Sequence, residues 1–313
     1  MAYVGATPWH GLGNKVEENI TLEEFQKEAG LDWSVSKRPV MYRADDGLGG
    51  IGTNVFKDKF VLARDTDNKP FAVVSSRYKP VQPKEIFAFF KDLLAMHNMT
   101  MHTAGALLDG GRIWCLAKTG DVHKVLGVDR VDSFLLLSTS YDLTLSTLAQ
   151  FTSVRVVCNN TLQQAMRDQT GRVTIPHVKE FNSASIHAQM GIGREQWSAF
   201  TAALDTLAKI KIDANKAAEV MDKVFKIPDD PEKRMADSDR IHAVNVIDMF
   251  RQKRYVGADL SGQTAWGLMN SLTEYVDWHK RARGQGNRLN NAWFGEGAKL
   301  KQNAMNELLE LAA

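Results

Sequence analysis

The sequence is short of cysteine and has no long apolar run. Cys115 and Cys158 are its two cysteines, each inside an apolar, β-branched or aromatic run. With no CxxC pair and no His-x3-His spacing beside them, they predict buried, reduced thiols that are dispensable for activity rather than a zinc site. Apolar runs such as 134–137 are too short for a membrane span, and the N-terminus lacks a basic segment followed by an apolar one. We expect a cytoplasmic protein without a membrane partner.

Net charge and nucleotide motifs are also scarce. The formal net charge of +2 is too small to indicate a nucleic-acid partner, so any such site must come from local clustering. No GxxxxGK[ST] motif is present, which excludes the usual ATP-driven strand transfer. Residues 47–52 match GxGxxG, but residues 54–60 read as turn and strand rather than as a helix, so a flexible glycine loop is the better interpretation. We expect no cofactor.

The first eighty residues contain local signals for a helix and a hairpin. Thr21-Leu22-Glu23-Glu24 forms a capping box, which predicts a helix over 21–29. Residues 61–63 and 71–74 are apolar runs on either side of a turn-rich segment. That pattern predicts a β-hairpin.

Residues 83–168 are expected to form the central fold. Pro83 predicts a helix that ends near His97, because proline is well tolerated in the first turn. Asp109-Gly110 between residues 101–108 and 112–118 predicts a tight hairpin, and 133–140 and 151–158 give two more strands. A short helix from Asn159 through Met166 would complete an order α-β-β-β-β-α.

Beyond residue 183 the sequence has almost no strand signal. Trp197, Phe200 and Leu204 recur at helical spacing, and so do the apolar residues of 220–225 and 268–276. We therefore predict an α+β fold in which an antiparallel sheet with packed helices, a β-β-β-α type core, precedes a mostly helical C-terminal part. The expected domains are 1–182, with that core at about 83–168, and 183–313.

Three groups of residues offer a catalytic or metal-binding alternative. Asp65 with Asp67-Asn68-Lys69 has the acid-plus-acid-x-lysine pattern of metal-dependent nucleases, although a solvated turn selects the same residues. Asp237, Asp239 and His242 could hold a metal, although an Asp-rich helix start is commoner. His10 beside Trp9 has no nucleophile or acid partner that the sequence can assign. We expect a protein that is not an enzyme and has no metal site.

Features of nucleic-acid binding occur at four places. Arg77-Tyr78-Lys79 sets an aromatic ring between two cations, and Arg112, Trp114 and Lys118 alternate onto one strand face. Arg155 lies on a strand that leads to Asn159-Asn160, a junction suited to a phosphate. Residues 277–301 hold six cations against two acids. The predicted DNA-binding residues are Arg77, Tyr78, Lys79, Arg112, Lys118, Arg155, Asn159, Asn160, Lys280, Arg281, Arg283 and Arg288. Surface decoration and complementation of a helix C-terminus are the alternatives.

Several motifs resemble one family across nearly the whole chain. They are 8–13 (PWHGLG), 78–82 (YKPVQ), 110–114 (GGRIW), 151–162 (FTSVRVVCNNTL), 264–266 (TAW), 274–277 (EYVD), 293–295 (WFG) and 299–301 (KLK). They are similar to the conserved phage- and plasmid-like proteins with domain of unknown function 932. That resemblance implies a mobile-element setting and brings no catalytic residues. The expected element order of 83–168 also resembles the core of the Rad-fifty-two superfamily, whose phage members anneal single strands as rings or helical oligomers without ATP.

Three functional hypotheses follow. The first is a homo-oligomeric protein of DNA recombination that binds single-stranded DNA and promotes ATP-independent annealing. The second is a phage accessory protein that binds a host protein, in counter-defence or regulation, through its aromatic-rich helical half. The third is a metal-dependent nuclease that uses Asp65 and Asp67.

Overall fold

A computed structural model describes residues 1–5, 8, 11–45, 50–97, 99–155, 160–163, 172–182, 184, 186 and 193–312. Its strands are β1 (Ala2–Val4), β2 (Asn14–Val16), β3 (Val35–Asp45), β4 (Ile51–Arg64), β5 (Pro70–Ser75), β6 (Thr100–Leu107), β7 (Arg112–Val125), β8 (Asp129–Ser140), β9 (Thr147–Arg155), β10 (Asn160–Gln163) and β11 (Arg172–Ile175). Its helices are α1 (Leu22–Glu28), α2 (Pro83–His97), α4 (Gly193–Lys209), α5 (Ala214–Phe225), α6 (Pro231–Ala236), α7 (Arg240–Arg251), α8 (Ala258–Ser261), α9 (Ala265–Glu274), α10 (Gln285–Phe294) and α11 (Glu296–Glu310). The fold is α+β, as predicted, and its C-terminal part is mostly helical.

The main sheet has eight strands. Seven of them follow the order β10-β9-β8-β7-β6-β1-β2, and β11 pairs with the first half of β9 beside β10. Strands β6 to β9 form an antiparallel meander, while β1 and β2 pair in parallel. The predicted antiparallel sheet within 83–168 is therefore confirmed.

Both faces of this sheet are buried, which explains its continuous apolar strands. On β7, Trp114 and Leu116 join a core with the C-terminal helices, whereas Ile113, Cys115 and Ala117 join a second core with α1 and α2. A strand covered on both faces needs apolar residues at every position rather than at every second one. The run 134–137 on β8 divides between the two cores in the same alternating way.

The local signals predicted several elements with accurate bounds. Thr21 caps α1, and Thr21 and Glu24 form the reciprocal capping box. Helix α2 spans Pro83–His97. Between β6 and β7, Asp109 and Gly110 both have positive φ, as a tight turn requires. Cys115 is buried and free, and burial raises the pKa of its thiol; Cys158 lies outside the described residues.

The helix predicted from Asn159 to Met166 is wrong over residues 160–163. These residues form β10, with Thr161 opposite Val154 and Leu162 opposite Ser153. The backbone groups at the end of β9 gain sheet partners in this way. Tertiary pairing overrides the local helix-start signal of the asparagines. Residues 159 and 164–166 lie outside the described residues.

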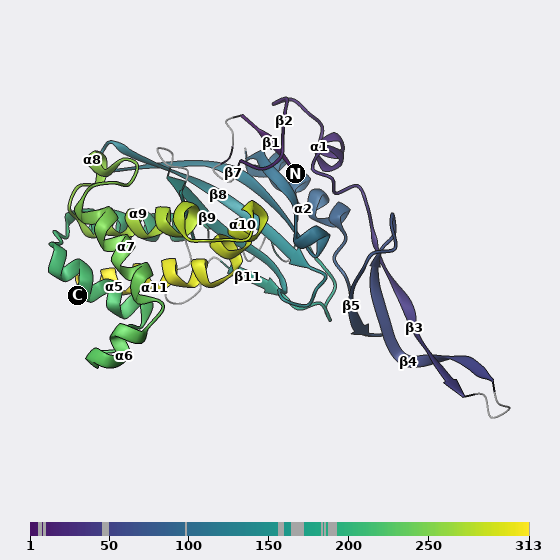
Figure 1. The fold of residues 1–313 in the computed structure, drawn as a ribbon. Helices are drawn as coiled ribbons and strands as arrows, with labels where there is room; N and C mark the ends of the chain where they lie inside the picture. The colour runs from purple at the N-terminus through teal and green to yellow at the C-terminus, as the bar shows by residue number, and fades with distance from the viewer. Residues whose placement is uncertain are drawn as a thin grey trace.

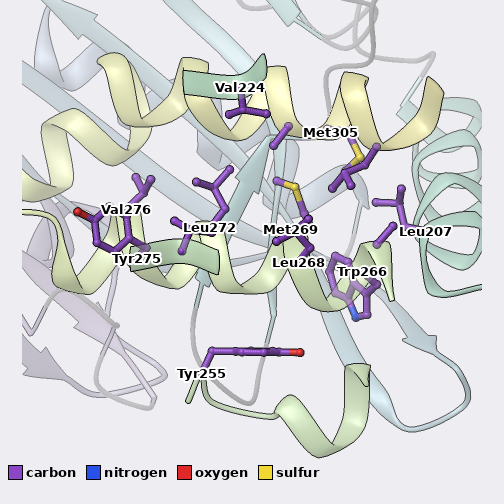
Figure 2. Close-up of a cluster of buried hydrophobic side chains, with 14 of the residues drawn as sticks. Leu207, Val224, Tyr255, Trp266, Leu268, Met269, Leu272, Tyr275, Val276 and Met305 are labelled. Carbon is purple, nitrogen blue, oxygen red and sulfur yellow. The ribbon is translucent and has the colours of Figure 1, made fainter. Parts of the chain in front are cut away.

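The C-terminal helices pack on the sheet and share its core. Figure 2 shows the middle of this cluster, where Leu268, Met269 and Leu272 of α9 lie among side chains of neighbouring helices. The Trp266 indole N–H donates to the carboxylate of Asp129 at the start of β8 over 2.8 Å. The two predicted parts, 1–182 and 183–313, thus meet across a common core. No helix in the described ranges is long and apolar enough to cross a membrane.

A second, three-stranded sheet has the order β3-β4-β5. Figure 1 shows its β3–β4 hairpin projecting from the body, at the opposite end of the view from the C-terminal helices. Strand β5 pairs with β4 over Lys59–Ala63, so the outer part of the hairpin is a two-stranded ribbon. We call residues 37–45 and 50–59 the arm.

Candidate nucleic-acid interface

The arm exposes large apolar and aromatic side chains. Tyr42 and Phe56 are about half exposed, and their rings meet edge to face with centroids 6.3 Å apart. Met41, Ile51 and Val55 are also exposed by more than half. Because a two-stranded ribbon in water buries little surface of its own, such a cluster is a candidate binding surface.

The arm is also basic. It carries five cations and two acids, and Arg43, Lys57 and Lys59 are exposed. No ion pair engages these three residues in the part of the chain that the structure describes. The register jumps from Pro39 opposite Phe60 to Met41 opposite Val55, so residues 56–59 have no partner on β3, while Lys59 pairs with Ser75 of β5. Phe56 of the aromatic pair and the exposed Lys57 are neighbours within this irregular segment.

The base of the arm extends this basic surface. Lys37 donates from Nζ to the carbonyl of Ser76 over 2.8 Å and lies over the ring of Phe60. Arg77, one of the predicted DNA-binding residues, follows Ser76 and is exposed. The arm itself was not predicted from the sequence, because both faces of this ribbon are exposed and its apolar residues do not alternate. The sequence feature that could have indicated the arm is the density of cations and aromatic residues between residues 37 and 59.

Tyr78 lies inside the protein. It is 8% exposed, its ring stacks on His177 at 4.8 Å, and its hydroxyl donates to the carbonyl of Ser140 over 3.2 Å. Burial, followed by the charge of Asp142, raises the pKa of the Tyr78 phenol. The ring is therefore not a surface on which a base can stack. The neighbouring Lys79 is exposed and pairs with Glu180 at 2.7 Å.

Arg112 joins the sheet to the helical part. Its guanidinium donates to Thr144 Oγ1 over 2.6 Å and to Asn290 Oδ1, and lies 4.9 Å from the ring centroid of Phe294. Trp114 on the same strand face is fully buried. Arg112 and Trp114 are thus covered by the C-terminal helices, whereas Lys118 is partly exposed. Lys118 pairs with Asp132 at 2.5 Å.

The predicted strand-to-helix junction is a strand-to-strand junction. Arg155 ends β9, and Asn160 at the start of β10 is its Cα partner. Their side chains and all of Asn159 lie outside the described residues. A helix N-terminus that could hold a phosphate is not formed by residues 160–163.

The C-terminal basic stretch divides into structural and exposed cations. Arg288 donates from Nη1 to the carbonyls of Trp278 and Lys280, at 2.7 and 2.8 Å, and so caps the π-helical turn Tyr275–His279. Lys280 is half-buried just after that turn. Arg281 and Arg283 are exposed, and no described carboxylate pairs with them. Lys299 is exposed too and pairs with Glu296 at 2.7 Å, so Arg281 and Arg283 are the exposed cations of the stretch that no described carboxylate engages.

The carboxylates of the nuclease alternative are engaged locally. Asp65 accepts hydrogen bonds from Ser34 and Ser36, both at 2.6 Å. The hydrogen bond from Arg64 holds the pKa of Asp67 at about 2. His242 contacts the hydroxyl of Tyr275 through Nδ1 at 2.5 Å. Among the described residues no three His, Cys, Asp or Glu side chains gather as metal ligands, and His10 lies outside them.

The glycine loop ends in a strand. Gly52 lies within β4, which begins at Ile51, so no helix N-terminus follows the GxGxxG match. Residues 47–49 lie outside the described residues. The dinucleotide interpretation of this motif lacks the helix that it needs.

These features define an α+β protein whose sheet is buried on both faces and which presents a basic, aromatic arm. The chain belongs to the family described as "Domain of unknown function (DUF932)", which matches residues 70–293. The resemblance drawn from the motifs is thereby confirmed, and the arm lies N-terminal to the matched region. No curated protein and no solved structure matches the chain. The order on which the Rad-fifty-two likeness rested differs at its last element, where β10 stands in place of a helix.

Proposed function

We propose that this chain is a single-stranded-DNA-binding protein of phage or plasmid recombination. It would promote the annealing of complementary strands without ATP, as a homo-oligomer in the host cytoplasm. The observation that carries the proposal is the arm, where exposed cations with no ion-pair partner in the described chain lie beside an exposed aromatic pair. Proteins that bind single strands without sequence preference combine these two features.

Each group on the arm has a defined role in this proposal. Arg43, Lys57 and Lys59 pair with phosphates, while Tyr42 and Phe56 stack against bases. Stacking engages the faces of the bases and leaves their Watson–Crick edges free, which is what annealing requires. Arg77, Arg281 and Arg283 are exposed cations that extend the path of the strand.

The other hypotheses have less support. The helical half uses most of its aromatics in its own core, including Phe200, Phe250 and Trp266. Its exposed apolar side chains, such as Met235 and Ile241, keep a host-protein interface as a second candidate. The nuclease hypothesis has the weakest support, because Asp65 is held by Ser34 and Ser36 and Asp67 by Arg64.

Removal of the arm cations tests the proposal. We expect the variant Arg43→Gln, Lys57→Gln, Lys59→Gln to bind a labelled 40-nucleotide strand at least tenfold more weakly near 0.1 M salt. Each phosphate contact contributes about 0.7 to the slope of log affinity against log salt, so the slope should fall by about 2. Fluorescence anisotropy across salt concentrations measures both quantities, and annealing of complementary strands should slow in parallel.

A matched variant controls for the loss of charge. Lys209→Gln, Lys211→Gln, Lys253→Gln removes the same charge from exposed positions on the helical part and should leave most of the affinity. The double variant Tyr42→Ser, Phe56→Ser should lose about 1–3 kcal/mol of DNA-binding free energy for each base that no longer stacks. Its salt slope should be unchanged. If a folded arm variant binds and anneals as the wild type does, the arm is not a DNA site.

A further inference from the structure

A cleft of about 730 Å³ opens where β1, α1, α2 and the strands β6 to β9 meet. Its walls are largely apolar and include the partly exposed side chains of Ile20, Leu22 and Met101. Its polar side chains are Glu18, Thr100 and His102 of β6, Lys118 of β7, and Arg130 and Asp132 of β8. A concave apolar surface with a few convergent polar groups is the usual form of a small-molecule site.

Two cations, Lys118 and Arg130, surround one buried acid, Asp132, in the cleft. The buried carboxylate of Asp132 pairs with Lys118 Nζ at 2.5 Å and with Arg130 Nε at 2.7 Å, so one anion is shared between two cations. Both cations are partly exposed. Glu18 also lines the cleft, and within the described structure no ion pair joins its exposed carboxylate to either cation. The cluster therefore has the capacity to pair with a further anion.

His102 adds a polar atom without a partner. Its Nδ1 is buried and makes no hydrogen bond within the described structure, and its ring meets the edge of Phe134 at 5.1 Å. Burial and the charge of Lys118 lower the pKa of His102 to about 4, so the imidazole is neutral at pH 7. The imidazole therefore lines the cleft as a neutral ring.

We propose that this cleft binds a small organic anion with an apolar or aromatic body. The body packs against Ile20, Leu22 and Met101, and the anionic group pairs with Lys118 and Arg130 beside the neutral ring of His102. The anionic group is a carboxylate or a phosphate, since both suit an arginine beside a lysine. This inference goes beyond DNA binding and does not depend on it.

A series of probes with one ring system and three charges tests the inference by isothermal titration calorimetry. The probes are 1-naphthoate, 1-naphthalenemethanol and 1-naphthylmethylammonium. We expect naphthoate to bind at least tenfold more tightly than the alcohol and the ammonium to show no binding. Equal affinity for the three probes, or no binding of naphthoate at millimolar concentration, overturns the proposal.

Two variants of the ion cluster should shift the affinity in opposite directions. Lys118→Met removes a cation and should bring the affinity for naphthoate down to that for the alcohol. Asp132→Asn releases both cations from their shared partner and should raise the affinity for naphthoate severalfold. Lys124→Met, at an exposed position further along β7, is the matched control and should change nothing.

The same titration distinguishes two sources of the anion. If thymidine monophosphate binds more tightly than naphthoate, the ligand of the cleft is a nucleotide. If naphthoate binds and thymidine monophosphate does not, the ligand is a carboxylate. Circular dichroism of each variant shows whether it is folded. If Lys118→Met does not fold, Asp132→Asn and Lys118→Arg still test the proposal. An Asp132→Asn protein with unchanged affinity for naphthoate contradicts it. A Lys118→Arg protein, which keeps the charge, contradicts it if its affinity for naphthoate is lost.

Discussion

Individual cations in this protein serve two different ends. Arg112 and Arg288 hold elements together through their guanidinium groups, and Lys301 is buried against Asp277 at 2.9 Å. Arg43 and Arg281 point into solvent. The sequence could not separate these roles, because the partner decides them and the partner can be remote: Arg112 meets Asn290, 178 positions further along the chain. Of the twelve residues predicted as DNA contacts, Tyr78, Arg112, Lys118 and Arg288 are among those that make contacts within the described structure.

The stability of the protein should depend on pH through His102. Its folded pKa of about 4 lies below the value of about 6.5 for an unfolded histidine. Protonation therefore favours the unfolded chain. The contribution of His102 to the free energy of unfolding should be constant above pH 6.5. It should fall as the pH drops from 6.5 to 4, by on the order of 2–3 kcal/mol in total.

Urea unfolding of the wild type and of His102→Gln at pH 7.5 and 4.5 measures this dependence. Other groups titrate in the same interval, so the difference between the two proteins isolates the histidine. A His102→Gln protein that loses as much stability as the wild type would mean that the imidazole is protonated freely in the folded state.

At the scale of elements, the sequence predicted what short-range chemistry determines. The capping box of α1, the start of α2 at Pro83 and the Asp109-Gly110 turn depend on residues within a few positions of one another. Strand β10 depends on β9 as a partner, so its residues were predicted as a helix. The arm was missed because a ribbon exposed on both faces leaves no periodic pattern.

The segment that joins α9 to α10 gives a prediction that separates structural from exposed cations. Arg288→Ala leaves the carbonyls of Trp278 and Lys280 without their donor and should cost about 1–3 kcal/mol of stability. Arg281→Ala with Arg283→Ala should leave the melting temperature unchanged. The double variant should weaken DNA binding for all sequences alike, with a salt slope smaller by about 1.4.

Thermal unfolding and fluorescence anisotropy, applied to both variants, decide this prediction. If the double variant has the same affinity and the same salt slope as the wild type, Arg281 and Arg283 do not contact DNA. A full loss of DNA binding in a folded Arg288→Ala protein would contradict its structural role.

At the scale of the whole molecule, the sheet and the C-terminal helices depend on one another. Leu116 and Phe134 of the sheet share one core with Phe200, Leu268 and other residues of the helices. The composition and periodicity predicted both parts and the change near residue 183. They could not predict that the helices cover the sheet, since an amphipathic helix does not specify its partner. The predicted domain boundary remains a prediction.

We expect the fragment 183–313 to form helices without fixed packing. Its apolar faces lose the sheet against which they pack, so far-UV circular dichroism should be helical while the near-UV signal is weak. The full chain should unfold in one transition that both signals report together. A fragment with a sharp near-UV spectrum and cooperative unfolding would show that the helical part is an independent domain.

The arm also determines where a protease should first cut the native chain. Trypsin needs a basic residue in backbone that can open locally, and Arg43, Lys57 and Lys59 lie on a ribbon with little packing to oppose opening. Limited digestion should therefore nick the arm while the body stays intact. The β3–β4 and β4–β5 pairing should hold the two pieces together in gel filtration. If the arm is a DNA site, a bound oligonucleotide should slow the cut, and mass spectrometry of the fragments would locate the protected bonds.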